Sequence, residues 1–305
     1  MPRPIHATIH LDALKHNLAV LRARAQDARV WAVVKADAYG LGVKRVAQAL
    51  ARAGARRFFV AAAEEGAAVR QALGPGPQIN ILSGHMAGDT DMIADLDLTP
   101  MLNSLDQVTR HLESLPGHAF GVQLNTGMNR LGFAPQRFRS AWTRLNALPQ
   151  VDEISLMTHF SDADGPAGVA AQFQAFEAVT HDLPGERTLS NSAALLRHGD
   201  ALAERSDWVR PGIAVYGSAA DFPQHSAHHW GLQPAMTLSA KLIAVQQIET
   251  GDSVGYGGSF TADRAMRIGV VACGYADGYP RHSGTGAPVL VDGVHTRLLG
   301  RVSMD

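Results

Sequence analysis

One lysine stands where an apolar segment of the chain ends. Residues 31–35, WAVVK, are apolar up to Lys35, and the residues that follow, ADAYGLG, are mostly small. A lysine at the end of an apolar strand is partly removed from water, which lowers the pKa of its ammonium group and frees the amine as a nucleophile toward an aldehyde. We therefore expect Lys35 to hold an aldehyde cofactor, although a lysine after a strand is more often a solvated loop charge.

Groups suited to a phosphate and a pyridine ring occur further along the chain. The segment SNSAAL, residues 190–195, offers hydroxyl and backbone N–H groups at a predicted helix start, where the helix dipole favours an anion. Gly212 offers another accessible N–H, and Arg210 is a candidate partner for a pyridine nitrogen. These residues indicate pyridoxal phosphate as the aldehyde. Taken singly, SNSAAL is also typical of a helix cap, Arg210 of an ion pair and His159 of a satisfied core histidine.

Short apolar runs alternate with amphipathic segments, which is typical of βα repeats. Eight strands are predicted at 31–35, 58–62, 79–83, 98–102, 119–124, 154–159, 187–190 and 208–213. Helices are predicted between them at 43–53, 64–73, 86–95, 104–115, 135–147, 167–182 and 192–203. This order favours an α/β fold with an N-terminal (β/α)8 TIM barrel, while an open doubly wound sheet is the alternative that periodicity alone leaves.

The polar residues occur where these strands end. In a (β/α)8 barrel the carboxyl ends of the strands meet at one mouth, where active sites are built. The residues expected there are Lys35 and Tyr39 after the first strand, 125–130 after the fifth, His159 at the end of the sixth, 190–192 after the seventh and Arg210 in the eighth. Their common position is what supports the site as a whole.

After Gly217 the pattern changes to strands without helices between them. Residues 236–248, 266–273 and 287–304 are strand-like, and residues 4–11 alternate with period two. We expect a barrel over residues 11–225 and an all-β domain formed by residues 1–10 and 226–305. The chain ends directly after an apolar run, so we also expect the last part of this β domain to be truncated.

Composition excludes several classes of protein. The 27 basic and 28 acidic residues are interspersed and the formal charge is −1, which indicates neither nucleic acid nor an anionic membrane as a partner. No apolar stretch reaches the roughly 18 residues of a membrane span, and the first residues lack the features of a secretory signal. Cys273 is the single cysteine, so a disulfide within the chain and a cysteine zinc cluster are excluded. We expect a cytoplasmic protein without a metal.

Taken together, the motifs resemble those of alanine racemase, a pyridoxal-phosphate enzyme family with a (β/α)8 barrel and a C-terminal β domain. The resemblance spans the whole chain. It is carried by VKADAYG (34–40), TGMNRLGF (126–133), MTHF (157–160), SNS (190–192), VRPGI (209–213), YG (216–217), GYG (255–257), GYADG (274–278) and GRVSMD (300–305).

The resemblance implies a role for each matching residue. Lys35 would hold the cofactor and exchange the D-alanine proton, while Tyr256 from the other subunit of a homodimer with shared active sites would exchange the L-alanine proton. Other implied roles are phosphate binding by Tyr39, Ser192, Gly212 and Ile213; the pyridine nitrogen for Arg210 with His159 behind it; the ring hydroxyl and substrate carboxylate for Arg130; a backbone contact to that carboxylate from Met304; and an access corridor lined by Tyr275, Arg281 and Arg301. The implied product, D-alanine, serves peptidoglycan synthesis or alanine catabolism.

Two departures from the family pattern affect the expected activity. Gln123 stands where the family often has a lysine that is carbamylated to orient the neighbouring arginine, and Asn125 replaces a more usual aspartate. A glutamine forms no carbamate, but we expect its carbonyl to accept a weaker hydrogen bond from Arg130. The family also continues beyond the residues that match 304–305, so a chain ending there is expected to bind the cofactor less tightly.

Three rival functions and a metal site are weighed against this interpretation. GDSVG at 251–255 matches a hydrolase nucleophile motif, with Asp277 and His295 downstream, but no helical period follows it. A pyridoxal-phosphate carrier is disfavoured by the β domain with its tyrosine, and another barrel enzyme of this cofactor, such as an amino-acid decarboxylase or a broad-specificity racemase, is the third rival. The histidines of 225–229 are interpreted as a solvated loop because no carboxylate follows at ligand spacing.

Overall fold

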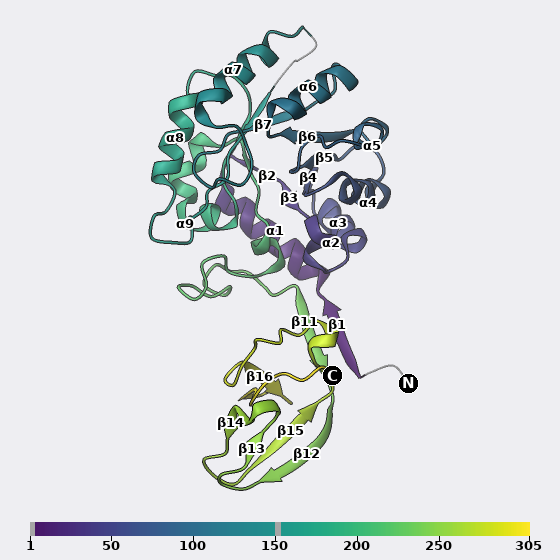
Figure 1. Cartoon of the computed structure of the whole chain (residues 1–305), viewed down its shortest axis with the longest axis vertical. Helices are drawn as coiled ribbons and strands as arrows, with labels where there is room; N and C mark the ends of the chain where they lie inside the picture. The colour runs from purple at the N-terminus through teal and green to yellow at the C-terminus, as the bar shows by residue number, and fades with distance from the viewer. Residues whose placement is uncertain (1–3, 150–153) are drawn as a thin grey trace. The chain divides into compact units, whose positions relative to one another are not determined.

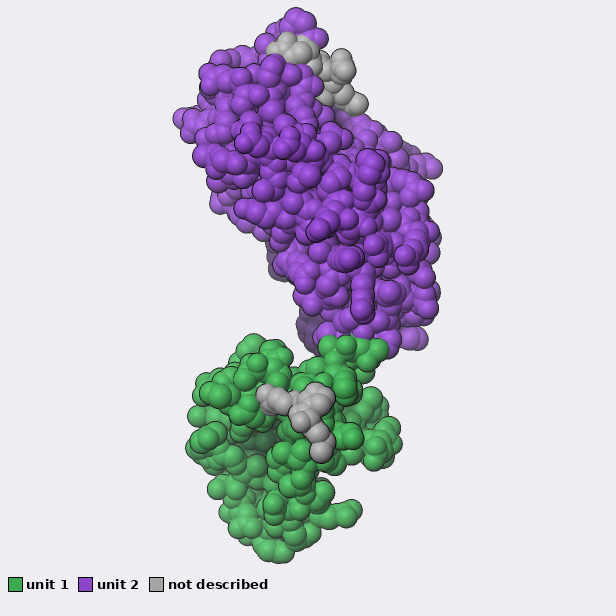
Figure 2. All heavy atoms as spheres, turned by 90° about the vertical axis from the view of Figure 1, so that its right-hand side faces the viewer, with its two compact units in different colours: residues 1–8, 237–305 green, residues 9–236 purple. Residues whose placement is uncertain are grey.

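The computed structural model describes residues 4–149 and 154–305. The chain divides into two compact units, Ile9–Met236 and a second unit made of Met1–Thr8 with Thr237–Asp305, which Figure 2 distinguishes by colour. Each unit has its own hydrogen-bonded sheets. The larger unit contains Lys35.

The larger unit contains a nearly closed barrel of parallel strands, seen in Figure 1 with helices around it. The strand order is β2-β10-β9-β8-β7-β6-β5-β4-β3, with bounds β2 Arg29–Val30, β3 Ala32–Val33, β4 Arg57–Val60, β5 Gln78–Ile81, β6 Leu98–Leu102, β7 Gly121–Gln123, β8 Ser155–Met157, β9 Arg187–Thr188 and β10 Trp208–Val209. Only Trp31 separates β2 from β3. The Trp31 N–H donates to the Val209 carbonyl (2.9 Å), and the Val34 N–H donates to the Phe59 carbonyl (2.8 Å). One extended stretch therefore joins the two edges of the sheet.

Helices alternate with these strands, as the amphipathic segments predicted. Their bounds are α1 Leu11–Ala25, α3 Val43–Arg52, α4 Ala63–Leu73, α5 Thr90–Asp95, α6 Leu105–Ser114, α7 Pro135–Asn146, α8 Ala170–Thr180 and α9 Ser192–Leu202, with 3₁₀ turns η1 Ala203–Arg205 and η2 Ile213–Tyr216. Each predicted strand position contains a strand, so the (β/α)8 prediction is confirmed and the open-sheet alternative is wrong. The closure follows from pairing at both edges.

Several predicted elements are shorter than expected, and in two of them a single residue accounts for the difference. The predicted strand 208–213 ends at Val209, because Pro211 lacks the N–H that a further ladder bond requires. Arg210 therefore follows the strand instead of lying in it. The predicted helix 86–95 begins only at Thr90, since Gly88 has a φ of +95° that a helix does not allow.

Large side chains fill the barrel interior. Trp31, Phe59 and Trp208 pack together, with ring centroids 4.6 Å apart for Trp31 and Phe59 and 5.1 Å apart for Trp31 and Trp208. At the amino ends of the strands, Glu186 accepts hydrogen bonds from Arg29, from Arg57 Nη1 (2.9 Å) and from Trp208 Nε1 (2.7 Å). Active sites of such barrels lie at the opposite end, so we interpret this cluster as structural.

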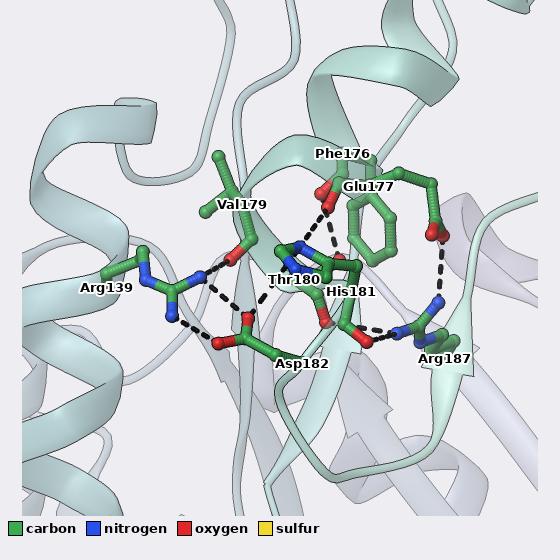
Figure 3. Close-up of polar contacts among 8 residues, drawn as sticks. All are labelled: Arg139, Phe176, Glu177, Val179, Thr180, His181, Asp182 and Arg187. Atoms are coloured by element: carbon green, nitrogen blue, oxygen red, sulfur yellow. Dashed lines mark hydrogen bonds and ion pairs between the residues drawn. The ribbon is translucent and has the colours of Figure 1, made fainter.

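Polar contacts also hold helices of the outer layer to the sheet. Figure 3 shows Arg139 of α7 paired with both carboxylate oxygens of Asp182, at 2.8 and 2.6 Å, while the same guanidinium donates to the Val179 carbonyl (2.8 Å). Arg187 of β9 donates to Glu177 of α8 at 2.8 Å. Ion pairs thereby connect α7 to the segment just after α8, and α8 to β9.

The second unit is built from short strands, which confirms a small β domain after the barrel. Its strand pairs are β1 Ile5–Ile9 with β11 Met236–Ala240, β12 Leu242–Ile248 with β15 Met266–Val271, β13 Ser253–Val254 with β14 Phe260–Thr261, and β16 Pro288–Val291 with β17 Val294–Arg297. The predicted strand 236–248 is two strands, β11 and β12. Two 3₁₀ turns, η3 Tyr256–Gly258 and η4 Tyr275–Asp277, carry tyrosines singled out above.

Candidate active site

Lys35 lies at the mouth of the barrel, two residues after β3 ends. Its side chain is half-buried, and removal from water lowers the pKa of Lys35, with a further lowering by the Arg130 charge. The Glu65 carboxylate acts in the opposite direction. Because a lysine with a lowered pKa has more of its amine unprotonated, this environment supports the nucleophilic role expected for Lys35.

The segment after Lys35, labelled α2 (Lys35–Tyr39), is a left-handed turn. Ala36, Asp37, Ala38 and Tyr39 all have positive φ, between 51° and 56°. This conformation costs an L-residue roughly 1–2 kcal/mol, so four in succession need outside support. The turn delivers Tyr39 to the ring of Tyr216, with centroids 4.5 Å apart, and Tyr216 donates its hydroxyl to the Val33 carbonyl at 2.9 Å.

Tyr39, Ser192 and Gly212 come together in one cradle. Ser192, the first residue of α9, is buried, and its Oγ accepts from the Gly212 N–H (2.8 Å) and the Ala214 N–H (3.3 Å). A Cβ on Gly212 would lie 2.2 Å from the Tyr39 hydroxyl oxygen. The close contact with Tyr39 therefore requires glycine at position 212. The hydroxyls of Tyr39 and Ser192 and the start of α9 come together here, where an anion would be favoured.

Ser192 and its neighbours meet the geometric needs of a phosphate. With two N–H groups donating to its Oγ, the hydroxyl proton of Ser192 is left to donate, and phosphate oxygens only accept. Asn191 precedes it as the N-cap of α9, with its Oδ1 accepting from the Ala194 N–H at 3.0 Å. The Gly212 N–H, which we expected to be accessible, instead donates to Ser192 Oγ. Ile213 begins η2 directly after Gly212 and is 37% exposed.

Arg210 is a buried cation that donates its hydrogen bonds to neutral groups. Its guanidinium donates to Thr188 Oγ1 and to the Thr158 carbonyl, both at 2.6 Å, and it is 4% exposed. Burial lowers the pKa of Arg210 to about 9. A buried charge with neutral partners is costly, which favours a ligand that accepts a hydrogen bond from it.

His159 lies among the positive charges of the same mouth. Burial, followed by the charges of Arg210, Arg130 and Lys35, lowers the pKa of His159 to about 3. The imidazole is therefore neutral near pH 7, and its Nε2 lies 3.5 Å from the side-chain nitrogen of Asn191. It contributes a polar contact to the site without adding charge.

Arg130 lies in the loop after β7, and Gln123 supports that loop in an unexpected way. We expected the Gln123 carbonyl to accept from Arg130, but the contact found is a donation from Gln123 Nε2 to the Leu131 carbonyl (3.2 Å). Asn125 Oδ1 accepts from the N–H groups of Gly127 (3.0 Å) and Asn129 (3.1 Å). Both unusual residues therefore hold the loop backbone, and the Arg130 side chain itself is exposed.

The remaining predicted site residues lie in the β unit. Tyr256 is 75% exposed and is the first residue of the turn η3. The Arg301 guanidinium lies beside the next residue, Gly257, since a Cβ added there would be 3.5 Å from Arg301 Nη1. The Met304 carbonyl accepts from the Ala276 N–H at 2.9 Å, and the Arg281 guanidinium lies 5.6 Å from the Tyr275 ring centroid. Tyr256, Tyr275, Arg281, Arg301 and Met304 thus belong to one unit.

Some residues that matter at the mouth were missed in the sequence. Thr158 and Thr188 accept from Arg210, Tyr216 donates to Val33, and Glu65 Oε1 accepts from the Ala36 N–H at 2.7 Å. Each of these four residues comes from a different part of the chain. Thr158 and Tyr216 stand in motifs that the family resemblance quoted, MTHF and YG, but no role was expected for either. No spacing rule identifies Glu65 and Thr188, because their contacts depend on which strands become neighbours.

The rival sites do not gain support from the geometry. Ser253 of GDSVG lies in β13 and is followed by the 3₁₀ turn η3, so the strand–turn–helix of a nucleophile elbow is lacking at this serine. His225 Nδ1 contacts Asp221 Oδ2 at 2.6 Å, which ties down its loop. Within residues 4–149 and 154–305, no cluster of three or more histidine, cysteine, aspartate or glutamate side chains is arranged to hold a metal ion. The helices of these residues are all too short or too polar to span a membrane.

Comparison with known proteins gives one family for both units. Residues 9–220 match the alanine racemase N-terminal domain, and residues 235–305 match the alanine racemase C-terminal domain. An alanine racemase of Polaromonas sp. (strain JS666) is 61% identical over all of this chain and 84% of the relative, and one of Variovorax paradoxus is 56% identical over all of this chain and 83% of the relative.

Solved structures agree. The biosynthetic alanine racemase of Pseudomonas aeruginosa superposes with a TM-score of 0.91 at 41% identity, covering 99% of this chain and 84% of that one. The alanine racemase of Bartonella henselae, solved with covalently bound pyridoxal phosphate, gives a TM-score of 0.86 at 28% identity over 100% of this chain and 85% of that one. By its sequence and by the fold of both units, the chain belongs to the alanine racemase family.

Proposed function

We propose that the chain is a pyridoxal-phosphate-dependent alanine racemase that moves the Cα proton with two bases, Lys35 and Tyr256. The observation that carries the proposal is the cradle in which Tyr39, Ser192 and Gly212 meet beside the half-buried Lys35. An anion site next to a nucleophilic lysine is what this cofactor needs, because it has a phosphate and an aldehyde. Family membership supplies alanine as the substrate.

The residues fit the cofactor group by group. Tyr39, Ser192, Gly212 and Ile213 would hold the phosphate, and Arg210 would face the pyridine nitrogen with His159 nearby. When bound, pyridoxal phosphate supplies an electron sink that makes the Cα proton of an attached amino acid acidic. Arg210 retains its own protons, since even its lowered pKa of about 9 lies well above neutral pH. The pyridine nitrogen would therefore accept a hydrogen bond from Arg210 without taking the proton.

Racemisation requires one proton to leave Cα on one face and another to arrive on the opposite face, so two acid–base groups are needed. Lys35 would remove or return the proton on the D side, and Tyr256 on the L side. Burial lowers the pKa of Lys35 toward the working range. Arg130 and the Met304 backbone would hold the substrate carboxylate while these transfers occur.

The second base is proposed to come from a partner subunit. Tyr256 is 75% exposed in its own chain, which suits a side chain that acts elsewhere. We propose a homodimer in which each barrel mouth receives Tyr256 from the other copy, with Tyr275, Arg281 and Arg301 lining the access corridor.

The test uses the full chain with pyridoxal phosphate and L-alanine or D-alanine in heavy water. The enantiomers are then separated, and the deuterium in each is measured by mass spectrometry. L-alanine should give D-alanine that carries deuterium at Cα. Tyr256→Phe should slow reaction from L-alanine more than exchange from D-alanine, whereas Tyr279→Phe, a tyrosine change in the same unit, should affect neither. Equal losses in the two directions would contradict the two-base scheme. Bound cofactor with unchanged alanine in the wild-type chain would instead favour a cofactor carrier or another substrate.

A further inference from the structure

A single carboxylate joins the turn after Lys35 to the end of a neighbouring strand. Glu65 lies in the first turn of α4, and its Oε1 accepts from the Ala36 N–H at 2.7 Å. Its Oε2 accepts from the Ala61 N–H, also at 2.7 Å. Ala36 directly follows Lys35 and Ala61 directly follows β4, so Glu65 connects two loops of the barrel mouth.

The turn that Glu65 contacts is the least favourable backbone at the mouth. Four consecutive residues without glycine, 36–39, have left-handed φ, and such segments persist only where their surroundings hold them. Asp37 holds the far side, because its Oδ1 accepts from the Val43 N–H at 2.7 Å. Glu65 holds the near side, at the residue adjoining Lys35.

A carboxylate is the group that this position requires. Both backbone groups that face Glu65 are donors, and each carboxylate oxygen only accepts. A glutamine of the same shape would satisfy one N–H with its carbonyl and would present its own N–H atoms to the other. The charge also strengthens both hydrogen bonds.

We propose that Glu65 is a positioning residue for Lys35, which fixes the left-handed turn so that the amine of Lys35 and the hydroxyl of Tyr39 are delivered to the same cofactor. The inference rests on the proposed function, in which Lys35 attaches pyridoxal phosphate. Glu65 also has an electrostatic effect, because its negative charge raises the pKa of Lys35 against the lowering by burial and Arg130.

The test compares Glu65→Gln with Glu64→Gln in the full chain. Glu64 is the preceding residue of α4 and is exposed, so its change removes the same charge from the same helix turn. Covalent attachment of pyridoxal phosphate to Lys35 is trapped with borohydride at successive times and located by mass spectrometry. Hydrogen exchange is measured without cofactor in peptides covering residues 36–40, and in β4 as a check on folding.

In Glu65→Gln we expect attachment to slow by about tenfold or more and exchange over residues 36–40 to quicken by a similar factor, because a charged hydrogen bond is lost. The kcat should fall while the KM for alanine changes little, since Glu65 is not proposed to contact substrate. Chemical labelling of Lys35 should reach its midpoint at a lower pH, a change that loss of packing alone would not produce. Glu64→Gln should behave as wild type in each measurement.

The outcomes separate the two proposals. If the wild-type chain does not attach the cofactor at Lys35, the proposed function fails and this inference fails with it. If the wild type attaches it, and Glu65→Gln matches Glu64→Gln in attachment rate, local exchange and labelling midpoint, only the role of Glu65 is overturned.

Discussion

Replacing Gly212 with alanine would place a methyl group inside the proposed phosphate cradle. The backbone of Gly212 has φ −102° and ψ −92°, so left-handed strain does not bar alanine there. The new Cβ would lie 2.2 Å from the Tyr39 hydroxyl oxygen, so that oxygen has to move by about 1 Å to reach an ordinary contact. The Tyr39 ring packs on Tyr216 with centroids 4.5 Å apart, which limits how it retreats.

We expect this displacement to weaken cofactor binding. Losing one charge-assisted hydrogen bond from Tyr39 costs roughly 1.5–3 kcal/mol, which raises the Kd for pyridoxal phosphate by about 10-fold to 100-fold. The assay is a titration of the cofactor-free full chain with pyridoxal phosphate, followed by protein fluorescence and cofactor absorbance. Racemisation at saturating cofactor should recover part of the activity, because Lys35 is unchanged.

Gly199→Ala is the matched control. A Cβ on Gly199, inside α9, would meet its nearest atom, the Arg24 carbonyl oxygen, at an ordinary 3.5 Å. This variant should bind the cofactor as the wild type does and gain roughly 0.5–1 kcal/mol in stability, since alanine is favoured over glycine in a helix. If Gly212→Ala bound pyridoxal phosphate as tightly as Gly199→Ala, the assignment of the cradle would be wrong.

Three further predictions address attachment, pH and the far end of the barrel. Lys35→Ala should abolish borohydride-trapped cofactor, and a trapped adduct at another residue would contradict the role of Lys35. Burial lowers the pKa of His111 to about 4 from 6.5, so the unfolded chain binds more protons between these values and stability falls as pH drops from 6.5 toward 4. In His111→Gln, the free energy of unfolding measured with urea should differ less between pH 7 and pH 4.5, by about 2 kcal/mol, than it does in the wild type. The same difference in both proteins would refute this prediction. Glu186→Gln at the amino ends of the strands should lower the free energy of unfolding by about 2 kcal/mol while kcat stays near wild type, and a large loss of kcat would show that this cluster serves the reaction.

Much of the fold was predictable because it depends on local patterns. Apolar runs and amphipathic segments placed all eight barrel strands and the helices between them, within a few residues at most boundaries. Errors arose where a single residue overrode the pattern, as Pro211 ended β10 and Gly88 delayed α5. Lys35, His159 and Arg210 were identified for a related reason, since strand ends in a barrel converge whatever the details of packing.

The partners of these residues were not predictable in the same way. Arg210 was expected to face a pyridine nitrogen, with an ion pair as the alternative. Neutral acceptors at two other strand ends, Thr188 Oγ1 and the Thr158 carbonyl, accept its hydrogen bonds. Gln123 was expected to accept from Arg130 and instead donates to the Leu131 carbonyl. These contacts join residues through side-chain directions that no periodicity encodes.

The sequence by itself determined the order of the strands and helices and the residue types at the strand ends, because strand and helix periods act over short stretches of chain. Closure of the sheet into a barrel was decided by the pairing of its two edges. Only the tertiary structure decided the left-handed turn after Lys35, the carboxylate of Glu65 that holds it and the contact between Tyr39 and Gly212. Each of these depends on loops that become neighbours when β3 pairs with β4 and β2 pairs with β10, and such neighbours exist only after the barrel has closed.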